Sequence, residues 1–582
     1  MSSQQQSYPL FLETNQELLQ DILKNLSLAY NPDAAEVYQR LTAAVDQEKL
    51  TEINNRYYEK QLDLWFSMLG RKPGEPGKSV TQPDKNDHRF QSAEWNELPY
   101  FDYLKQYYLV TSKWLMELVD SARLDSQIKK KLRFVTRHYI DAMSPANFPA
   151  TNPDVLRLAA ETKGESINKG LKNFLEDLEK GHISMTDESA FEVGNNLAIT
   201  RGQVVFENDL IQLIQYGPLT ETVDEFPLLI VPPCINKYYV LDMRPENSFV
   251  RYAVEQGNNV FIISWRNIPP ELGTLTWDDY IEQGVLQAIK VCLAIAKAKK
   301  LHALGFCVGG TLLACALAVL RAKRRNPVAS LTLLATMLDF ADTGEISVYV
   351  DSAYVQKIAA EIGKGGLVPG RDLALTFASL RANELVWYYV VNNYLKGRTP
   401  FAFDLLYWNC DSANLPGPMY VYYVRSMYLE NNLKTPGKLM MCGVSIDLGQ
   451  IGVPAYILAA KEDHIVPWKS AYASVPLLKG KTEFVLTASG HIAGVVNPPT
   501  KSKRSFWSAR ASGGEPEQWL ANAQFSEGSW WPHWSTWLKQ KSHKRVPARA
   551  KLGSKQYPAI EPAPGRYVRE NCKIPESGQR AA

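Results

Sequence analysis

The sequence predicts an α/β fold in which strands and helices alternate around a mostly parallel, doubly wound sheet. The first observation is that, from about residue 200 onward, short apolar runs alternate with longer segments that can form helices. The strand-like runs are residues 204–206, 228–231, 260–263, 301–304, 331–334, 455–458 and 484–486, and helices fit between them, for example at 279–299 and 311–323. The second observation is a cysteine between two glycines at the junction of one such strand and the helix after it.

That junction reads Gly-Phe-Cys-Val-Gly at residues 305–309. This is the pattern of the nucleophile elbow in the α/β-hydrolase fold, with cysteine where serine is usual. The glycines permit a strained turn and a close approach of helix to strand. The turn places Cys307 at a helix N-terminus, where the helix dipole favours the thiolate over the thiol. We therefore expect an α/β-hydrolase fold with Cys307 as its nucleophile.

In this fold the catalytic acid and then the histidine follow the nucleophile along the chain, each on a loop after a strand. Asp463 and His491 occupy these two positions. Glu462 fits the acid loop equally well, and Asp463 is preferred because its arm is shorter. His464 is an alternative base, but it adjoins Asp463, and neighbouring side chains on an extended loop point apart. We expect His464 to be a hydrogen-bonded residue beside the triad.

An oxyanion hole needs two backbone N–H groups directed at the developing negative charge. The residue after the nucleophile, Val308, supplies one of them in this fold. The second is expected from the loop that follows the strand at residues 226–233, where Cys234 is the first residue. Cys234 is thus a candidate backbone donor, and the alternative is a cysteine with a purely structural role in the loop.

The chain is predicted to have two domains, a mainly helical one at residues 1–195 and a catalytic one at 196–582. Apolar residues recur at helical spacing in the first domain, at 12–30, 35–69, 100–119 and 132–143, and residues 71–78 have the composition of a linker. The interval between Cys307 and Asp463 is much longer than one β-α unit needs, which indicates an insertion at 341–447. This insertion is rich in Tyr and Trp, so we expect a cap over an apolar acyl tunnel. The alternative is a helical excursion that only packs on the sheet.

Composition excludes several classes of function. A net charge of +3 produces no strong field toward nucleic acid or an acidic membrane. The seven scattered cysteines indicate a reducing compartment rather than a disulfide framework. No metal or phosphate-binding motif is recognisable, so no metal and no cofactor is expected. The polar first residues and the short apolar runs predict a cytoplasmic protein without a transmembrane segment.

Seven segments together resemble the motifs of one enzyme family. They are residues 100–104, 148–153, 232–239, 305–310, 404–409, 462–468 and 489–494. The chain resembles the class I polyhydroxyalkanoate (poly-3-hydroxybutyrate) synthases from about residue 80 to its C-terminus. One departure is Asp-His-Arg-Phe at residues 87–90, where the family usually has Asp-Arg-Arg-Phe.

The resemblance implies an acyltransferase that polymerises (R)-3-hydroxyacyl-CoA, with 3-hydroxybutyryl-CoA as the expected monomer, into a polyester while releasing CoA. It also implies that Cys307, Asp463 and His491 are the catalytic triad, and that the protein is a homodimer on polyester granules in the cytoplasm. Trp408 lies in the insertion and is a large aromatic residue of the kind that anchors interfaces. We expect it at the dimer interface, with the core of the cap as the alternative.

Two other functions remain as alternatives. A cysteine hydrolase of the dienelactone-hydrolase kind has the same Cys, Asp and His set, but the long insertion and the extra helical domain argue against it. A non-catalytic granule-associated protein could keep the same fold, but an intact triad argues against that function.

Overall fold

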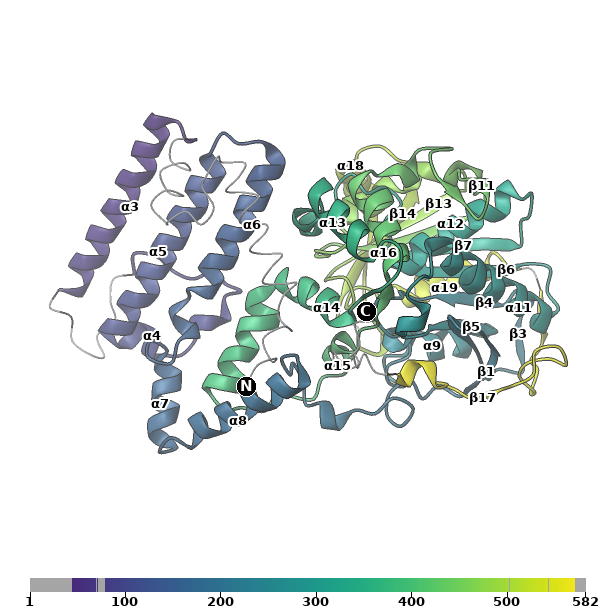
Figure 1. Ribbon diagram of the computed structural model, residues 1–582, viewed down its shortest axis with the longest axis horizontal. Coiled ribbons are helices and arrows are strands. Elements are labelled where there is room, and N and C mark those ends of the chain that lie inside the picture. The colour runs from purple at the N-terminus through teal and green to yellow at the C-terminus, as the bar shows by residue number, and fades with distance from the viewer. Residues whose placement is uncertain (1–43, 70, 72–78, 502, 543, 571–582) are drawn as a thin grey trace. The chain divides into compact units, whose positions relative to one another are not determined.

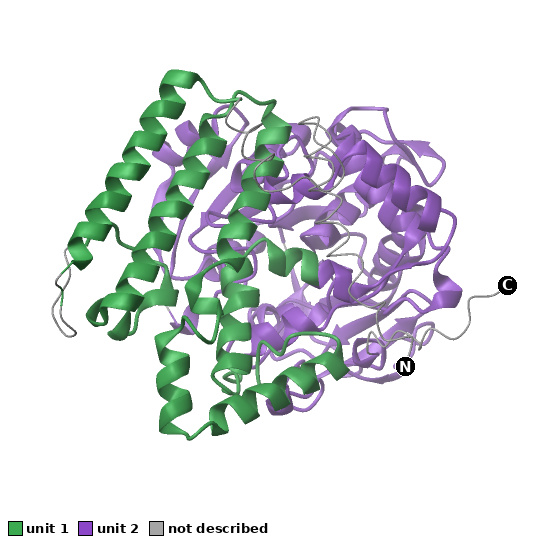
Figure 2. Ribbon diagram, turned by 60° about the vertical axis from the view of Figure 1, so that its left-hand side comes forward, with its two compact units in different colours: residues 1–187, 375–402 green, residues 188–374, 403–582 purple. Residues whose placement is uncertain are grey.

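The computed structural model describes residues 44–69, 71, 79–501, 503–542 and 544–570, and Figure 1 shows its helices and strands. The chain divides into two compact units (Figure 2). The first comprises residues 1–187 and 375–402, and the second comprises residues 188–374 and 403–582. The helix expected at residues 12–30 and nearly all of the linker expected at 71–78 lie outside the described residues.

The first unit is helical. The helices expected at 100–119 and 132–143 are α5 and α6, and the described part of the segment at 35–69 contains α3. Side-chain caps begin several of these helices, as Asp46 does for α3 and Asn152 for α7. The helices of this unit are α3 (Gln47–Met68), α4 (Glu94–Glu97), α5 (Pro99–Ser121), α6 (Ser126–Ala142), α7 (Pro153–Glu161), α8 (Glu165–Lys180) and the π-helical turns η8 (Asn383–Trp387) and η9 (Val390–Leu395).

Residues 375–402 are joined to the N-terminal helices by polar contacts and close packing. Asn383 Nδ2 donates to Asp141 Oδ1 at 2.6 Å, and the Tyr394 hydroxyl donates to Asp177 Oδ2 at 2.7 Å. A Cβ added at Gly170 of α8 would lie 1.9 Å from the Tyr394 carbonyl oxygen, so only glycine permits this approach. Part of the insertion expected at 341–447 therefore belongs to the helical unit. The boundary at 195 and the limits of the cap stay predictions.

The second unit is built on an eleven-stranded sheet, counted over the described residues, with the order β15-β14-β13-β12-β7-β6-β4-β5-β2-β1-β17. All seven predicted strands are present in it. The strands are β1 (Gly202–Glu207), β2 (Ile211–Tyr216), β4 (Leu228–Val231), β5 (Val260–Trp265), β6 (Leu301–Phe306), β7 (Val328–Leu334), β12 (Ala455–Ala460), β13 (Thr482–Thr487), β14 (Ser505–Ala511), β15 (Gln524–Glu527) and β17 (Glu561–Pro562).

The sheet is mixed, which corrects the expectation of a mostly parallel one. The six central strands from β13 to β5 run parallel, whereas every pairing outside them is antiparallel. Neighbours such as β1 and β2 are joined by a short turn, and a short turn can connect only antiparallel strands. The α/β class itself is confirmed.

Helices cover both faces of this sheet. Alternate residues of each strand point to opposite faces, so each strand contributes side chains to the packing on both sides. On one face, Tyr456 of β12 packs in a core with Trp530 and with Phe249 of α9 (Phe249–Glu255). On the other face, Phe484 of β13 contacts Tyr472 of α17 (Trp468–Ala473), with 5.0 Å between ring centroids. Both faces are therefore buried, as a sheet with a parallel centre requires.

The remaining helices flank the sheet or belong to the inserted segment, and α14 (Gly370–Ser379) begins in the second unit and ends in the first. The helix expected at 279–299 consists of α10, the π-helical η6 and α11. No helix among the described residues combines the length and the apolar character needed to cross a membrane. The elements are α10 (Trp277–Asp279), η6 (Tyr280–Leu286), α11 (Gln287–Ala296), α12 (Val308–Ala322), α13 (Ser352–Ile362), α14 (Gly370–Ser379), α15 (Asp404–Cys410), α16 (Gly417–Tyr423), η10 (Val424–Leu429), α18 (Pro516–Asn522), α19 (Trp531–Lys539) and the paired strands β3 (Thr222–Asp224) with β16 (Arg545–Pro547), β8 (Leu367–Val368) with β9 (Leu415–Pro416), and β10 (Met440–Met441) with β11 (Val444–Ser445).

Candidate active site

Cys307 occupies a strained turn between strand β6 and helix α12. Its backbone has φ +53° and ψ −130°, a conformation that non-glycine residues rarely adopt. The turn is held by hydrogen bonds on both sides, from Cys307 N to Leu334 O at 2.9 Å and from Gly310 N to Cys307 O at 2.9 Å. The surrounding structure thus maintains the geometry that the pentapeptide predicts.

The glycines around Cys307 are required by the packing of α12. A Cβ added at Gly305 would lie 2.4 Å from the Cα of Gly310. A Cβ added at Gly309 would lie 2.4 Å from the carbonyl oxygens of both Val231 and Pro232, at the end of β4. Helix α12 can therefore begin this close to the sheet only because these positions lack side chains.

Asp463 and His491 come together from the loops after the adjacent parallel strands β12 and β13. The distance from His491 Nδ1 to Asp463 Oδ2 is 2.6 Å. The other carboxylate oxygen, Oδ1, accepts hydrogen bonds from the backbone nitrogens of Ile465 and Val466, both at 2.8 Å. Glu462, the alternative acid, is exposed. The geometry therefore favours Asp463 as the partner of the histidine.

The surroundings of His491 stabilise its charged form. Burial lowers the pKa of His491, but the charges of Asp463 and Cys307 and hydrogen bonds to both residues outweigh burial and raise this pKa to about 10. The ring also stacks on Phe306, with 5.4 Å between centroids. A histidine whose charged form is stabilised in this way can accept and hold the proton of a thiol.

The two predicted oxyanion donors lie at the ends of neighbouring elements. Val308 is the first residue of α12, so its N–H has no acceptor within the helix. Cys234 is in the loop after β4 and is buried, and this burial raises the pKa of its thiol well above the usual value. The Cys234 thiol therefore stays protonated at neutral pH, consistent with a backbone role rather than a second nucleophile. The donation of both N–H groups to an oxyanion stays a prediction.

Trp408 and His464 are the other residues that the sequence analysis singled out. Trp408, in α15, is only 4% exposed, and its Nε1 donates to the Lys237 carbonyl oxygen at 2.6 Å. This burial supports the alternative in which Trp408 is a core residue, and its role at a dimer interface stays a prediction. His464 is half-buried in the loop of Asp463, and its place beside the triad also stays a prediction.

Two tyrosines, Tyr423 at the end of α16 and Tyr428 in η10, are close enough to Cys307 for its charge to act on them, and the sequence analysis did not place either of them in the site. Burial raises the pKa of both hydroxyls, and the nearby charge of Cys307 adds to the increase. Their ring centroids are 5.3 Å apart, and the Tyr423 ring stacks on Trp277 at 5.2 Å. Phe340 contacts both rings. We call Tyr423, Tyr428 and Phe340 the aromatic wall. The abundance of tyrosine in the insertion indicated that aromatic side chains gather there, but it did not identify these positions.

Comparison with known proteins agrees with this geometry. Residues 86–253 match the family model described as "Poly-beta-hydroxybutyrate polymerase (PhaC) N-terminus", and residues 227–498 match the "alpha/beta hydrolase fold" model. The chain is 52% identical to the poly(3-hydroxyalkanoate) polymerase subunit PhaC of Cupriavidus necator, over 90% of this chain and 88% of that protein. It is 41% identical to the corresponding subunit of Rhizobium meliloti, over 90% and 86%, and 41% identical to the poly(3-hydroxyalkanoate) polymerase of Methylorubrum extorquens, over 90% and 87%.

Proposed function

The chain belongs to the poly(3-hydroxyalkanoate) polymerase family, and from this premise we propose that Cys307, His491 and Asp463 carry out its acyl transfer. The activity is that of an acyltransferase that joins hydroxyacyl units from CoA thioesters into a polyester. The observation that carries the assignment of residues is the 2.6 Å contact between His491 and Asp463, in a site where the charge of Cys307 also raises the pKa of His491.

The first step loads the enzyme with an acyl group. His491 takes the proton of the Cys307 thiol, and the thiolate attacks the thioester carbonyl of the hydroxyacyl-CoA. The N–H groups of Val308 and Cys234 stabilise the oxyanion. The bond from the carbonyl carbon to the CoA sulfur then breaks, and CoA leaves with the proton from His491. Because one thioester replaces another, the acyl group stays activated.

The second step extends the polyester. A hydroxyl group, from another acyl unit or from the chain end, attacks the acyl-cysteine carbonyl while His491 accepts its proton. The new ester bond forms, the bond to the Cys307 sulfur breaks, and the proton returns to the thiol. Asp463 holds the imidazole in the required orientation and stabilises its charge in both steps.

Hydrolysis of the acyl-cysteine is the competing reaction, so the site must limit water. The aromatic wall of Tyr423, Tyr428 and Phe340 supports this requirement, because the three rings pack on one another, the charge of Cys307 acts on both tyrosines, and Tyr423 and Phe340 are buried. The apolar surface of this wall suits an acyl chain, and we propose 3-hydroxybutyryl-CoA as the preferred monomer. We include the homodimer and the association with polyester granules in the cytoplasm in this proposal, since an insoluble product grows from the enzyme.

The test is CoA release from hydroxybutyryl-, hydroxyhexanoyl- and hydroxyoctanoyl-CoA, with analysis of the product formed from each. We expect polymer from hydroxybutyryl-CoA at the highest rate. Free hydroxy acid in place of polymer would instead identify a hydrolase. Sedimentation of the protein with and without a substrate analogue tests the dimer separately.

A further inference from the structure

A second concave site lies in the same unit, at the opposite edge of the sheet from Cys307. It is a cavity of about 1070 Å³ whose wall includes the connection between α11 and β6. Lys300 immediately precedes β6 and Cys307 immediately follows it. The six residues of that strand separate the two ends by roughly 20 Å at the usual rise for a strand. The cavity is therefore distinct from the catalytic site.

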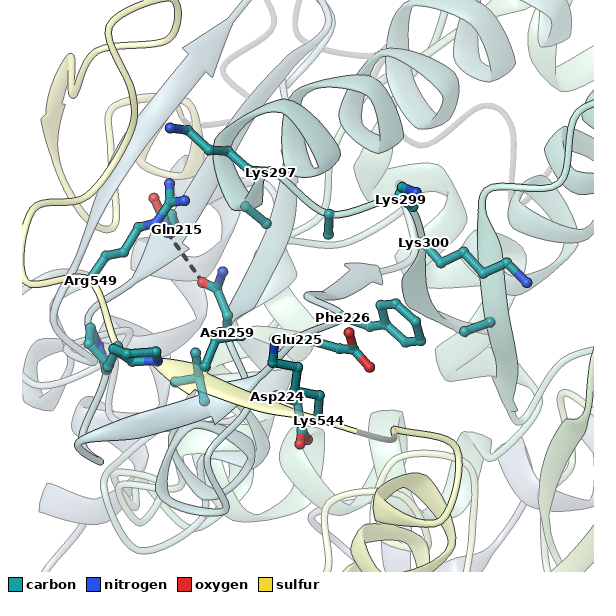
Figure 3. A pocket seen from close by; sticks show the side chains of 18 of the residues that line it. Gln215, Asp224, Glu225, Phe226, Asn259, Lys297, Lys299, Lys300, Lys544 and Arg549 are labelled. Carbon is teal, nitrogen blue, oxygen red and sulfur yellow. Dashed lines mark hydrogen bonds between the residues drawn. The ribbon is translucent and has the colours of Figure 1, made fainter.

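The cavity is rich in positive charge. Six basic and two acidic side chains line it, and Figure 3 shows most of them as sticks. The basic residues are Lys297, Lys299, Lys300, Lys541, Lys544 and Arg549. One of the two carboxylates, that of Asp224, lies 3.9 Å from the Arg545 guanidinium, which offsets its charge. The lining therefore favours an anionic ligand.

The basic residues after Lys541 are held in place by backbone pairing rather than lying on a free tail. Strand β16 pairs antiparallel with β3, with Arg545 opposite Asp224. The ladder continues beyond the strands, because Glu225 N donates to Lys544 O at 3.0 Å and Ala548 N donates to Glu221 O at 2.9 Å. Lys544 and Arg549 are thus fixed at the two ends of one short ribbon.

The inner wall adds a neutral donor. Gln215 Nε2 donates to Asn259 Oδ1 at 3.2 Å (Figure 3), and Gln215 Oε1 accepts from Gly553 N at 2.7 Å. The bond from Gly553 orients the Gln215 amide, and the bond from Gln215 orients the Asn259 amide. Since the Asn259 oxygen is the acceptor in this bond, the Asn259 Nδ2 group is the one that can donate to a ligand. Amide and cationic N–H groups that the protein already holds in place are good hydrogen-bond donors to phosphate oxygens.

The rest of the wall is apolar. Phe226, Val223, Ala298 and Pro547 line it together with further small apolar residues. The Phe226 ring packs edge to face against the ring of buried His302, with 5.7 Å between the ring centroids. Small-molecule sites typically combine an apolar surface with a few oriented polar groups, and the volume of this cavity is slightly above their usual range of about 300–1,000 Å³.

We propose that this cavity binds a small phosphorylated ligand with a flat ring, of the nucleoside di- or triphosphate class. The phosphates interact with the lysines of residues 297–300 and with Lys544 and Arg549, and the ring lies on the apolar wall near Phe226. A concave site with an apolar wall fits such a ligand better than it fits a membrane or a nucleic-acid duplex, both of which need an extended basic surface.

The test measures binding of ATP and of inorganic triphosphate to the full chain by titration calorimetry. We expect ATP to bind more tightly than triphosphate, because only ATP carries the ring. The variant K299Q/K300Q/K544Q should weaken ATP binding by about tenfold or more, since each lysine removed costs a charge-assisted contact. The matched control K364Q/K438Q/K479Q removes three exposed lysines outside the cavity and should leave ATP binding unchanged.

A second measurement needs no variant. ATP should protect Lys299, Lys300 and Lys544 of the wild-type chain from an amine-reactive label, with Lys364 as the unprotected internal reference. Undetectable ATP binding, equal loss in the control variant, or protection absent from these three lysines would overturn the proposal. Equal affinity for triphosphate and ATP would overturn the nucleoside class. None of these readouts uses CoA release, so they are independent of the proposed acyl transfer.

Discussion

The imidazole of His491 and the carboxylate of Asp463 meet at 2.6 Å, although they are 28 residues apart in the chain. The contact forms because β12 and β13 are parallel neighbours, so the loops after both strands lie at the same edge of the sheet. Cys307 follows β6 at that same edge. The parallel centre of the sheet is therefore what assembles three residues from three distant loops.

Replacing Cys307 by alanine should abolish CoA release, because Cys234, the other cysteine near the site, is buried with a protonated thiol. Cys307→Ser is expected to be nearly inactive as well, since the much higher pKa of a hydroxyl makes it difficult for His491 to activate. CoA release measured with a thiol reagent tests both variants. More than a trace of polymer from Cys307→Ala would contradict the assignment of the nucleophile.

The two partners of the nucleophile should differ when replaced. His491→Gln removes the base for both steps, whereas Asp463→Asn removes orientation and charge support and should slow turnover by about 10²–10⁴-fold. We expect the Asp463→Asn enzyme to form the acyl-cysteine slowly and then stall, so a radiolabelled acyl group should be trapped on it. Complete loss of the first CoA release in both variants would show that acylation also requires Asp463.

Stability should depend on the proton of His491. Its folded pKa of about 10 lies above the ordinary value of 6.5, so the folded state retains a proton that the unfolded state releases between these values. This contribution to stability is fully present below about pH 6.5 and is lost as the pH rises through about 10. The melting temperature of the wild type should therefore decrease over this window, and His491→Gln should show a smaller decrease. Parallel curves for the two proteins would argue against the charged pair.

Trp408→Ala should lower thermal stability. The side chain is 4% exposed and its indole N–H is bonded to Lys237 O, so its removal leaves a cavity and breaks this hydrogen bond, at a cost of about 3–5 kcal/mol in the free energy of unfolding. Calorimetry measures this loss, and sedimentation measures the dimer fraction at a temperature where the variant is folded. A fall in the dimer fraction without a change in melting temperature would restore Trp408 as an interface residue.

Tyr423→Ala should broaden the range of acyl chains. Removing this ring from its stack on Trp277 opens space beside Cys307, so the ratio of kcat/KM for hydroxyhexanoyl-CoA to that for hydroxybutyryl-CoA should rise. Exposed Tyr388→Ala, in the helical unit, is the matched control and should leave this ratio unchanged. An unchanged ratio in Tyr423→Ala would exclude this ring from the acyl pocket.

Local sequence patterns were sufficient for the elements that carry the triad. The nucleophile elbow depends on glycines within a few residues of Cys307, and the buried strands depend on short apolar runs, so both are visible without the rest of the chain. The loops with Asp463 and His491 could be found because the fold prescribes their order. The antiparallel edges of the sheet were not predicted, because pairing direction depends on how connections close in space.

Contacts between distant segments could be seen only in the folded chain. Both Glu462 and Asp463 were compatible with the sequence, and the position of His491 distinguishes them. The sequence alone assigned residues 375–402 to a cap, but Asn383 and Tyr394 form hydrogen bonds with helices α6 and α8 of the first unit, to which residues 375–402 belong. Tyrosine is common throughout the insertion, and only packing selects Tyr423 and Tyr428 as the neighbours of Cys307. The physical reason is that composition and spacing determine which segments become strands and helices, whereas burial and pairing between remote segments determine which side chains meet.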